Sequence, residues 1–387
     1  MDLLIPEGFG LNPIHRTHHI QLSIVMFKFL KKIEEKISHY QKMRIYKKRI
    51  TANMSSLEER RRLSKQQKKE VQSFYQGLMG RKIPLYSHEY FYSRTGVFAK
   101  EYFPTNIYYC DLLGKANRYP YNQAYGDKNI CDMLFPGENV AHTLLKNMNG
   151  YYYIEGQPVA EDDAVRYCQN IDDVMIKPSG SHSGYGVHKL VVKDGVTNID
   201  GKRIEELFRE YKEDFLIQKC IHQHADMSAL NPTSVNTMRI LTYRSGMEVL
   251  LIYAVIRIGR LGAVIDNQSS GGMSVAIDEQ GCLGKYAAEG YATDRVEKTE
   301  SGVILEGYQL PSYDKAIQMV KRLHLHLPYF NIVGWDIAIE ENGEPILIEW
   351  NNKPGLSQSS FASGFGKHTE RIVRELWPRE NTRYPLV

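Results

Sequence analysis

The stretch that most constrains the fold is Ile332–Gly355, because it combines a hairpin signal with acidic residues at a fixed spacing. Apolar residues alternate with other residues on both sides of Asn342-Gly343, a dipeptide typical of a tight turn between antiparallel strands. If these two residues form the turn, Asp336 lies directly opposite Glu349. A three-residue turn would shift the register by one and place the two acids on opposite faces.

Carboxylates on directly opposed strand positions lie about 5 Å apart and repel each other unless a cation lies between them. Asn351 follows Glu349 on the same face of the strand. Two carboxylates and an amide oxygen suit Mg²⁺, which in proteins also binds substrate phosphates. An exposed hairpin whose acids bind nothing is the alternative. The opposed pair favours a Mg²⁺ site at Asp336, Glu349 and Asn351, and it predicts phosphate-binding residues elsewhere in the chain.

Composition limits the remaining classes of protein. The chain has 387 residues, of which 42% are hydrophobic and 24% charged, as in soluble globular proteins. Its five cysteines are scattered and form no C-x-x-C pair, which argues against disulfides and a zinc site and is typical of the cytoplasm. No apolar run approaches the roughly 18 residues of a membrane span, and we expect no secretory signal.

Basic residues are concentrated near the N-terminus, where we expect residues 1–80 to form a basic, mostly helical region. Residues 28–70 contain 15 Lys and Arg against 5 Asp and Glu. Apolar residues recur there at helical spacing: Leu30, Ile33, Ile37 and Tyr40. The favoured interpretation is that this stripe packs on the body of the protein, which we expect to begin near Met26. An anionic membrane surface is the second interpretation, and nucleic acid is the weakest because no recognition motif is present.

Helix and loop signals follow in order. Ser64 with Gln67 forms a capping box, which predicts a helix that ends before Gly80. Residues 81–125 are rich in aromatic and turn-forming residues, and they predict a linker layer ahead of the main domain. His88 lies among these aromatic residues, and we expect it to be a hydrogen-bonded core residue.

A loop of small residues indicates phosphate binding. Asp173–Val192 is typical of two apolar strands joined by a loop that contains Gly180, Gly184 and Gly186. Such a loop lets backbone N–H groups approach phosphate oxygens, and Lys177 at the end of the first strand reaches the same phosphates. It is not a Walker loop, because no GK[ST] follows. A merely flexible turn is the alternative.

Three further segments carry candidate binding groups. Phe215–Ile221 predicts a short strand whose backbone can face an adenine ring. Arg239 and Arg257 lie on expected strands, where a buried arginine needs an acidic partner or a bound anion; surface salt bridges are the alternative. The loop Gly262–Val275, which includes Asn267, can close over a small substrate.

Taken in order, these motifs resemble those of the ATP-grasp superfamily, and they are most similar to the sugar-transfer-associated ATP-grasp proteins found with bacterial surface-polysaccharide genes. The resemblance extends from about Ser64 to the C-terminus. It rests on SHEYFYSRTGVFAKEYFP, DKN at 127–129, VMIKPSGSHSGYGV, SVNTMRILT, IDNQSSGG, GWDIAI and IEWNNKPG. It implies an α+β ATP-grasp fold, in which two α/β subdomains clasp ATP between antiparallel sheets. The core would span 126–387, with the Gly-rich-loop subdomain at about 170–220 and the metal and substrate subdomain at about 221–387.

The same resemblance implies the site residues. ATP would be bound by Lys128, Lys177, Ser179, Gly180, Ser183, Gly184, Gly186, Gln218, Cys220 and Ile221, of which the two lysines hold phosphates and the last three receive adenine. Mg²⁺ would be bound by Asp336, Glu349 and Asn351. The reaction centre would contain Arg239, Arg257 and Asn267, with the arginines steadying the transferring phosphoryl group. Gln218 replaces a glutamate of many relatives and Tyr185 a frequent lysine, so adenine contacts and loop closure can differ here.

The function that the resemblance implies is an ATP- and Mg²⁺-dependent carboxylate–amine ligase that acts through an acyl phosphate. It would join an amino acid or other amine to a sugar carboxylate, such as a uronic acid, in capsule or O-antigen biosynthesis. The alternatives are a kinase that phosphorylates a hydroxyl group and a non-catalytic, nucleotide-binding scaffold at the membrane. We expect a cytoplasmic protein with peripheral contact to the inner face of the membrane through its basic helix, and no nucleic-acid partner.

Overall fold

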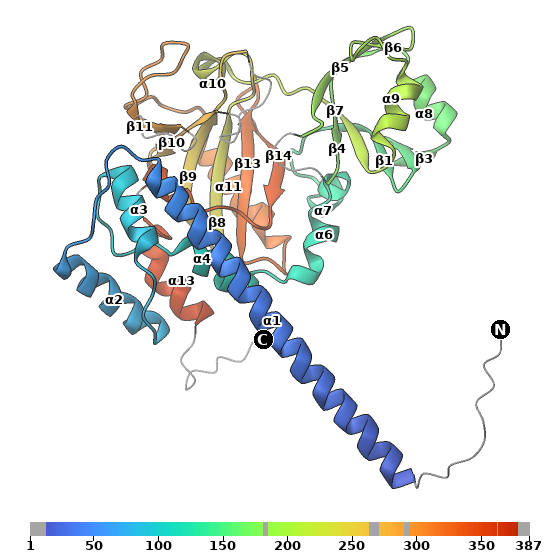
Figure 1. The fold of residues 1–387 in the computed structure, drawn as a ribbon. Coiled ribbons are helices and arrows are strands. Elements are labelled where there is room, and N and C mark those ends of the chain that lie inside the picture. The colour runs from blue at the N-terminus through green and yellow to red at the C-terminus, as the bar shows by residue number, and fades with distance from the viewer. Residues whose placement is uncertain (1–12, 181–184, 263–270, 290–294, 362, 378–387) are drawn as a thin grey trace.

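Two antiparallel sheets form the framework of the protein (Figure 1). The computed structural model describes residues 13–180, 185–262, 271–289, 295–361 and 363–377. Within these residues each sheet has seven strands, in the orders β3-β2-β1-β7-β4-β5-β6 and β12-β11-β10-β9-β8-β13-β14. Helices cover the sheets, so the predicted α+β class with two antiparallel sheets is confirmed.

The strands of the first sheet are β1 (Thr143–Met148), β2 (Tyr151–Ile154), β3 (Gln157–Val159), β4 (Ile171–Pro178), β5 (His188–Lys193), β6 (Val196–Thr197) and β7 (Phe215–Lys219). Those of the second are β8 (Thr237–Ser245), β9 (Glu248–Ile258), β10 (Met273–Ile277), β11 (Leu283–Glu289), β12 (Arg295–Val296), β13 (Ile332–Ile339) and β14 (Pro345–Asn351). The longer helices are α1 (Pro13–Ser55), α2 (Lys65–Met79), α3 (Tyr86–Thr95), α8 (Glu161–Tyr167), α9 (Ile204–Tyr211), α10 (Ala225–Leu230), α11 (Tyr313–Leu325) and α13 (Thr369–Leu376). Short helical turns are α4 (Thr105–Ile107), η1 (Tyr108–Leu112), α5 (Leu113–Ala116), η2 (Tyr119–Tyr121), α6 (Asn122–Tyr125), η3 (Lys128–Ile130), α7 (Cys131–Leu134), α12 (Gln358–Phe361) and η5 (Gly366–His368).

The first sheet packs on α8 and α9 around its own core. Leu207 and Phe208 lie on the inner face of α9, and they bury against Phe215 and Ile217 of β7. The sheet begins at Thr143, ahead of the expected boundary near residue 170. Strands β1 to β3 therefore lie in the same sheet as the Gly-rich loop, although their short sequences carry only weak strand signals.

The second sheet is buried on both faces. Along β8, Met238 and Ile240 join the core beneath α11, whereas Leu241 and Tyr243 join the core on the opposite face. That opposite core includes Tyr75 of α2, residues of the 81–125 segment and residues of α13. The aromatic segment thus packs directly on the second sheet. Because successive strand residues point to opposite faces, one strand supplies both cores.

Several local predictions near the N-terminus are confirmed. Ser64 and Gln67 form the capping box of α2, and Gly80 ends that helix in the left-handed conformation. His88 is fully buried and hydrogen-bonds the carbonyl oxygen of Lys100 through Nε2, and burial lowers its pKa to about 4.

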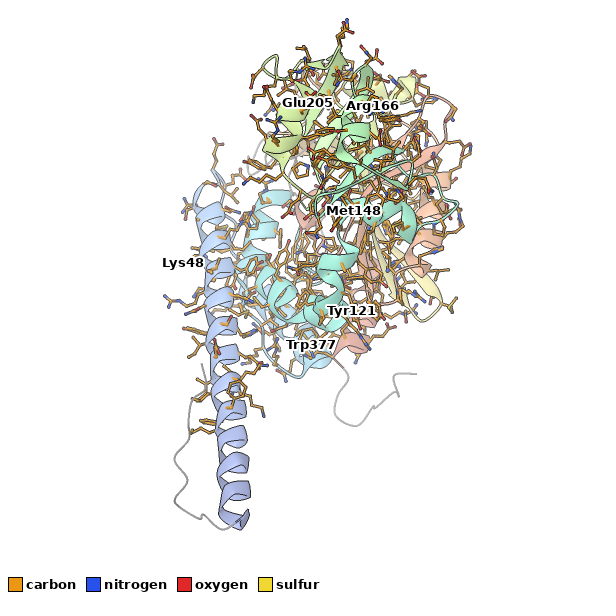
Figure 2. All side chains as sticks on the ribbon, turned by 90° about the vertical axis from the view of Figure 1, so that its right-hand side faces the viewer. Lys48, Tyr121, Met148, Arg166, Glu205 and Trp377 are labelled. Atoms are coloured by element: carbon orange, nitrogen blue, oxygen red, sulfur yellow. The ribbon has the colours of Figure 1, made fainter. Side chains whose placement is uncertain are left out.

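The favoured interpretation of the basic helix is wrong. Helix α1 runs alongside the body only near its C-terminal end, and its N-terminal end stands away from the body (Figures 1 and 2). Leu30, Ile37 and Tyr40 are 56%, 53% and 64% exposed. The compact body begins near Met43, not near Met26. Helical spacing predicted the stripe correctly, but it carries no information about how far the body extends beneath the helix.

The hairpin has the predicted pair but a different turn. Asp336 lies opposite Glu349, as predicted. The N–H of Glu340, however, donates to the carbonyl oxygen of Glu344, so three residues form the loop. A bulge at Ile348 of β14 adds one residue and restores the register. The expectation of a two-residue turn is therefore wrong, and the bulge places both acids on one face.

Replacing glycine by alanine should have opposite effects at two positions. Gly343 in the hairpin loop has a φ of 78°, where alanine is strained, so Gly343→Ala should lower the free energy of unfolding by about 1 kcal/mol. Gly77 lies inside α2, where an added Cβ would meet open space, so Gly77→Ala should raise it by up to about 1 kcal/mol. Urea denaturation measures both changes, and the same sign for both would contradict these backbone assignments.

Candidate functional site

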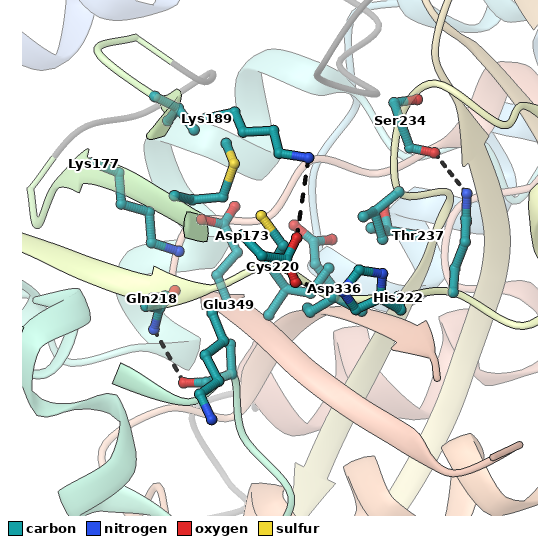
Figure 3. A pocket seen from close by; sticks show the side chains of 18 of the residues that line it. Asp173, Lys177, Lys189, Gln218, Cys220, His222, Ser234, Thr237, Asp336 and Glu349 are labelled. Atoms are coloured by element: carbon teal, nitrogen blue, oxygen red, sulfur yellow. Dashed lines mark hydrogen bonds and ion pairs between the residues drawn. The ribbon is translucent and has the colours of Figure 1, made fainter. Parts of the chain in front are cut away.

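A cavity of about 470 Å³ lies between the two sheets. Its wall includes β4 and β7 from the first sheet and β9, β13 and β14 from the second (Figure 3). Eight of the predicted site residues line it: Lys128, Lys177, Gln218, Cys220, Ile221, Arg257, Asp336 and Glu349. The structure therefore brings together residues that are up to 221 positions apart, between Lys128 and Glu349.

The other predicted residues do not line this cavity within the described part of the chain. Ser179, Gly180 and Gly186 lie in the β4–β5 connection, and Arg239 and Asn351 lie on β8 and β14. Ser183, Gly184 and Asn267 lie outside the described residues.

The acidic pair has contrasting electrostatics. Burial opposes ionisation of Asp336, but the charges of Arg239 and Arg257 outweigh it and hold the pKa of this carboxyl well below its usual range. Burial, and then the adjacent Asp336, raise the pKa of Glu349 against the opposing charges of Lys128 and Lys177. Glu349 is also within hydrogen-bonding contact of Asp336. Two adjacent carboxyl groups whose pKa values move in opposite directions are suited to a divalent cation, which removes their repulsion.

Asp336 is held by two arginines on neighbouring strands. Arg239 of β8 donates to both carboxylate oxygens, with Nη2 2.8 Å from Oδ2, and Nη1 of Arg257 lies 3.5 Å from Oδ2. Arg239 was predicted to steady a phosphoryl group; in the structure its guanidinium contacts Asp336, and it is not among the described residues that line the cavity. Arg257 remains at the wall, where it can contact both Asp336 and a bound anion.

Asn351 completes the predicted metal set. It follows Glu349 at the end of β14, and its side-chain Nδ2 is buried without a hydrogen-bond partner. Rotating the Asn351 side-chain amide by 180° exchanges its oxygen and nitrogen. The amide oxygen can then face a cation at this position. The described residues contain no cluster of three His, Cys, Asp or Glu side chains that could hold a metal. Two carboxylates and this unsatisfied amide are hard donors that fit Mg²⁺.

Two lysines supply the positive side of the cavity. Lys177 on β4 is 9% exposed, and burial lowers its pKa to about 8, with Glu349 opposing the shift. Lys128 lies between the sheets: Nζ is 3.3 Å from the carbonyl oxygen of Ser179 and 3.8 Å from Oε2 of Glu349. Lys128 therefore links the Gly-rich connection of one sheet to the carboxylate of the other. A bound phosphate would compensate the buried charge of Lys177 and the partly buried charge of Lys128.

The base of the Gly-rich connection requires glycine at one end. Gly186 has a φ of 70°, and a Cβ there would lie 2.9 Å from Cγ of Pro178. The hydroxyl of Tyr211 donates to the carbonyl oxygen of Gly186 at 2.7 Å. At Gly180, by contrast, a Cβ would meet open space. The packing thus fixes Gly186, whereas Gly180 leaves room for a ligand to approach the backbone.

The strand β7 is tied to the segment before β1. Nε2 of Gln218 donates to the carbonyl oxygen of Ala141 at 3.1 Å and to Oγ1 of Thr143 at 2.8 Å. The N–H of Cys220 donates to the carbonyl oxygen of Asp173 at 2.8 Å, so this donor is already used. Of the backbone groups predicted to contact adenine, the carbonyl group of Cys220 and the backbone of Ile221 therefore remain available.

Sequence reasoning missed several residues of the wall. Asp173 and Met175 line the cavity together with Lys177 because alternate residues of β4 share one face. Period-two spacing from Lys177 could have identified both. His222, which pairs with Asp173, and Lys189 also lie here (Figure 3). Lys189 carried no signal beyond an ordinary surface charge.

The comparison with known families decides the classification. A model of the sugar-transfer associated ATP-grasp family matches residues 110–372, more than half of the chain. The chain belongs to this ATP-grasp family. A search of curated proteins finds no match.

Solved structures give weaker matches to this ATP-grasp chain. The L-amino acid ligase from Bacillus licheniformis has a TM-score of 0.37 and 11% identity, over 65% of this chain and 48% of the ligase. The N5-carboxyaminoimidazole synthase from Aspergillus clavatus has a TM-score of 0.38 and 12% identity, over 67% and 54%. The ATP-grasp ligase PsnB has a TM-score of 0.39 and 12% identity, over 67% and 63%. The chain thus covers less than two thirds of the length of each protein.

Nucleotide binding should take up a proton at Lys177. Its pKa of about 8 leaves the amine mostly neutral at pH 8.5, and an adjacent phosphate favours the charged form. We expect ADP in EDTA to bind with uptake of more than about half a proton at pH 8.5, and with less uptake at pH 7.5. Calorimetry in buffers of different ionisation enthalpy measures this number. Lys177→Met should abolish the uptake; equal uptake by both proteins would contradict the assignment.

Proposed function

We propose that the protein is a cytoplasmic, ATP- and Mg²⁺-dependent carboxylate–amine ligase. The observation that carries the proposal is the arrangement of charges in one cavity, where Asp336 and Glu349 face Lys128 and Lys177 between two sheets. An acidic pair and a lysine pair at opposite sides of a cleft suit a nucleotide phosphate chain with its metal ion. Membership of the ATP-grasp family supports the same ligand.

The proposed roles follow the positions of the side chains. Lys177 and Lys128 bind phosphate oxygens, and Gly180 lets the backbone approach them. The β7 strand and its exit at Ile221 hold adenine. Mg²⁺, held by Asp336, Glu349 and Asn351, would neutralise charge on the terminal phosphates. Arg239 fixes the orientation of Asp336, which makes it a positioning residue.

The reaction requires two displacements. An oxygen of the acceptor carboxylate attacks the γ-phosphorus of ATP, and the bond to the bridging oxygen breaks to release ADP. The amine nitrogen then attacks the acyl carbon, inorganic phosphate leaves, and the amine loses a proton. Arg257 at the cavity wall stabilises the negative charge on the transferring group, so the protein acts mainly by positioning and electrostatics.

We propose a sugar carboxylate, such as a uronic acid in capsule or O-antigen biosynthesis, as the acceptor, and an amino acid as the amine. The description of the matching family supports a link to sugar transfer. Arg257 at the cavity wall supplies a positive charge that an anionic acceptor needs.

A hydroxylamine assay tests the proposal directly. With Mg²⁺, ATP and a panel of uronates, the protein should form ADP and a hydroxamate in equal amounts, because hydroxylamine intercepts an acyl phosphate. ADP release without any carboxylate requirement would reject the ligase. A phosphorylated product that resists amines would instead identify a kinase acting on a hydroxyl group.

The acidic pair should be essential for turnover. Glu349→Gln should lower kcat/KM by about 100-fold or more, because charge stabilisation at the phosphates is lost, and its thermal unfolding should stay close to that of the wild type. Glu344→Gln is the matched control, since Glu344 lies on the same hairpin but pairs with Lys315 outside the cavity. Equal activities of the two variants would contradict the assignment.

A further inference from the structure

Helix α1 exposes an unusual number of large apolar side chains. Eight of them are between 38% and 69% exposed: Met26, Phe27, Phe29, Leu30, Ile33, Ile37, Tyr40 and Ile45. Single exposed apolar residues are ordinary on protein surfaces, but a contiguous group on one element marks an interaction surface. The catalytic site described above uses none of these residues.

Most of these side chains form one stripe. Met26, Leu30, Ile33, Ile37 and Tyr40 follow each other at intervals of four and three residues, which places them on the same side of an α-helix. We call these five residues the α1 stripe.

A different face of α1 is attached to the body. Tyr46 stacks on Tyr109 with ring centroids 4.8 Å apart, His39 lies 3.4 Å from Asp111, and Ile50 is buried. These contacts lie on a side of the helix that is about 140° from the α1 stripe. The attachment therefore holds the helix while the stripe remains exposed, and Figure 2 shows Lys48 where α1 lies alongside the body and the N-terminal part of the helix extending beyond it.

The charge of the helix indicates what covers the stripe. Residues 28–49 contain nine Lys and Arg and two Glu. Lys32 and Lys36 are exposed; Lys36 lies beside Ile33 and Tyr40 of the stripe, and Lys32 lies one turn away next to Lys36. An apolar stripe on a helix with this excess of basic residues matches an anionic lipid surface, in which acyl chains lie beneath a layer of phosphate groups.

We propose that α1 binds the surface of an anionic lipid bilayer, with the α1 stripe inserted among the acyl chains and the basic side chains at the lipid phosphates. No helix in the described part of the chain has the length and apolarity needed to cross a membrane. Binding of this kind places the helix in the plane of the interface.

Two other occupants fit less well. A second copy packed along the stripe would bring together two helical segments that each carry this excess of basic residues, and the heptad spacing ends at Arg44 after about two repeats. Nucleic acid would account for the basic residues, but it gives no favourable burial to aliphatic side chains such as Leu30 and Ile37.

Vesicle sedimentation tests the proposal with the full-length protein. The wild type should sediment with vesicles of 70% phosphatidylcholine and 30% phosphatidylglycerol, and about tenfold more weakly with pure phosphatidylcholine. Leu30→Ser with Ile37→Ser should weaken binding to the anionic vesicles by about tenfold or more, because apolar insertion is lost. Lys32→Gln with Lys36→Gln should weaken binding to anionic vesicles only.

A matched control removes apolar side chains of similar exposure elsewhere. Met247→Ser with Ile304→Ser, at positions that are 76% and 69% exposed on the body, should leave vesicle binding unchanged. Thermal unfolding should be the same for all variants. Three results would overturn the proposal: no binding by the wild type, equal loss in the control, or retention by the Leu30 and Ile37 variant. A wild-type dimer that becomes a monomer in that variant, without vesicle binding, would identify a second copy as the occupant.

Discussion

The structure depends on one unfavourable arrangement, the placement of two carboxyl groups side by side on adjacent strands. Asp336 and Glu349 are opposed in the β13–β14 hairpin, and burial makes their repulsion costly. Arg239 and Arg257 compensate Asp336 from the same sheet, whereas Lys128 and Lys177 approach Glu349 from the side of the first sheet. The acidic pair is therefore the point at which the two sheets are electrostatically coupled.

This coupling explains why so much of the chain is needed to build one cavity. Lys128 contacts both Ser179 and Glu349, and thus spans the junction of the sheets. Gln218 ties β7 to the segment before β1, which positions the opposite wall. Without the acids, the two lysines would repel each other. Without a cation nearby, the two carboxyl groups would repel each other unless one of them were protonated. A metal ion with a phosphate chain satisfies both groups at once, and we propose this as the reason for the arrangement.

The sequence correctly predicted those site residues whose positions follow from the alternation of side chains along a strand. Lys177, Asp336 and Glu349 lie where strand patterns place them, and the two-sheet fold class is confirmed. The predicted two-residue turn was wrong because Gly343 is equally compatible with a three-residue loop. The bulge at Ile348 was not predicted because it has no sequence signature. The two errors cancelled, so the opposed acidic pair was still found.

Long-range packing could not be predicted in the same way. Arg239 was expected to need an acidic partner or a bound anion, but that the partner is Asp336 follows from a strand pairing that only the tertiary structure defines. The stripe of α1 was recognised from its spacing, but whether a body lies beneath it depends on where α3 and η1 are placed. Local sequence patterns therefore predicted which side chains share one face of a strand or helix. Which other element each face contacts could be learned only from the structure.

The central claim is that Glu349 belongs to a metal site that acts on a bound nucleotide. The most direct test is the affinity for ADP of the wild type and of Glu349→Gln, each measured by calorimetry with Mg²⁺ and with EDTA. The account predicts that Mg²⁺ strengthens ADP binding by about tenfold or more in the wild type and has little effect in the variant, while the two proteins bind ADP similarly in EDTA. An equal effect of Mg²⁺ in both proteins would contradict it.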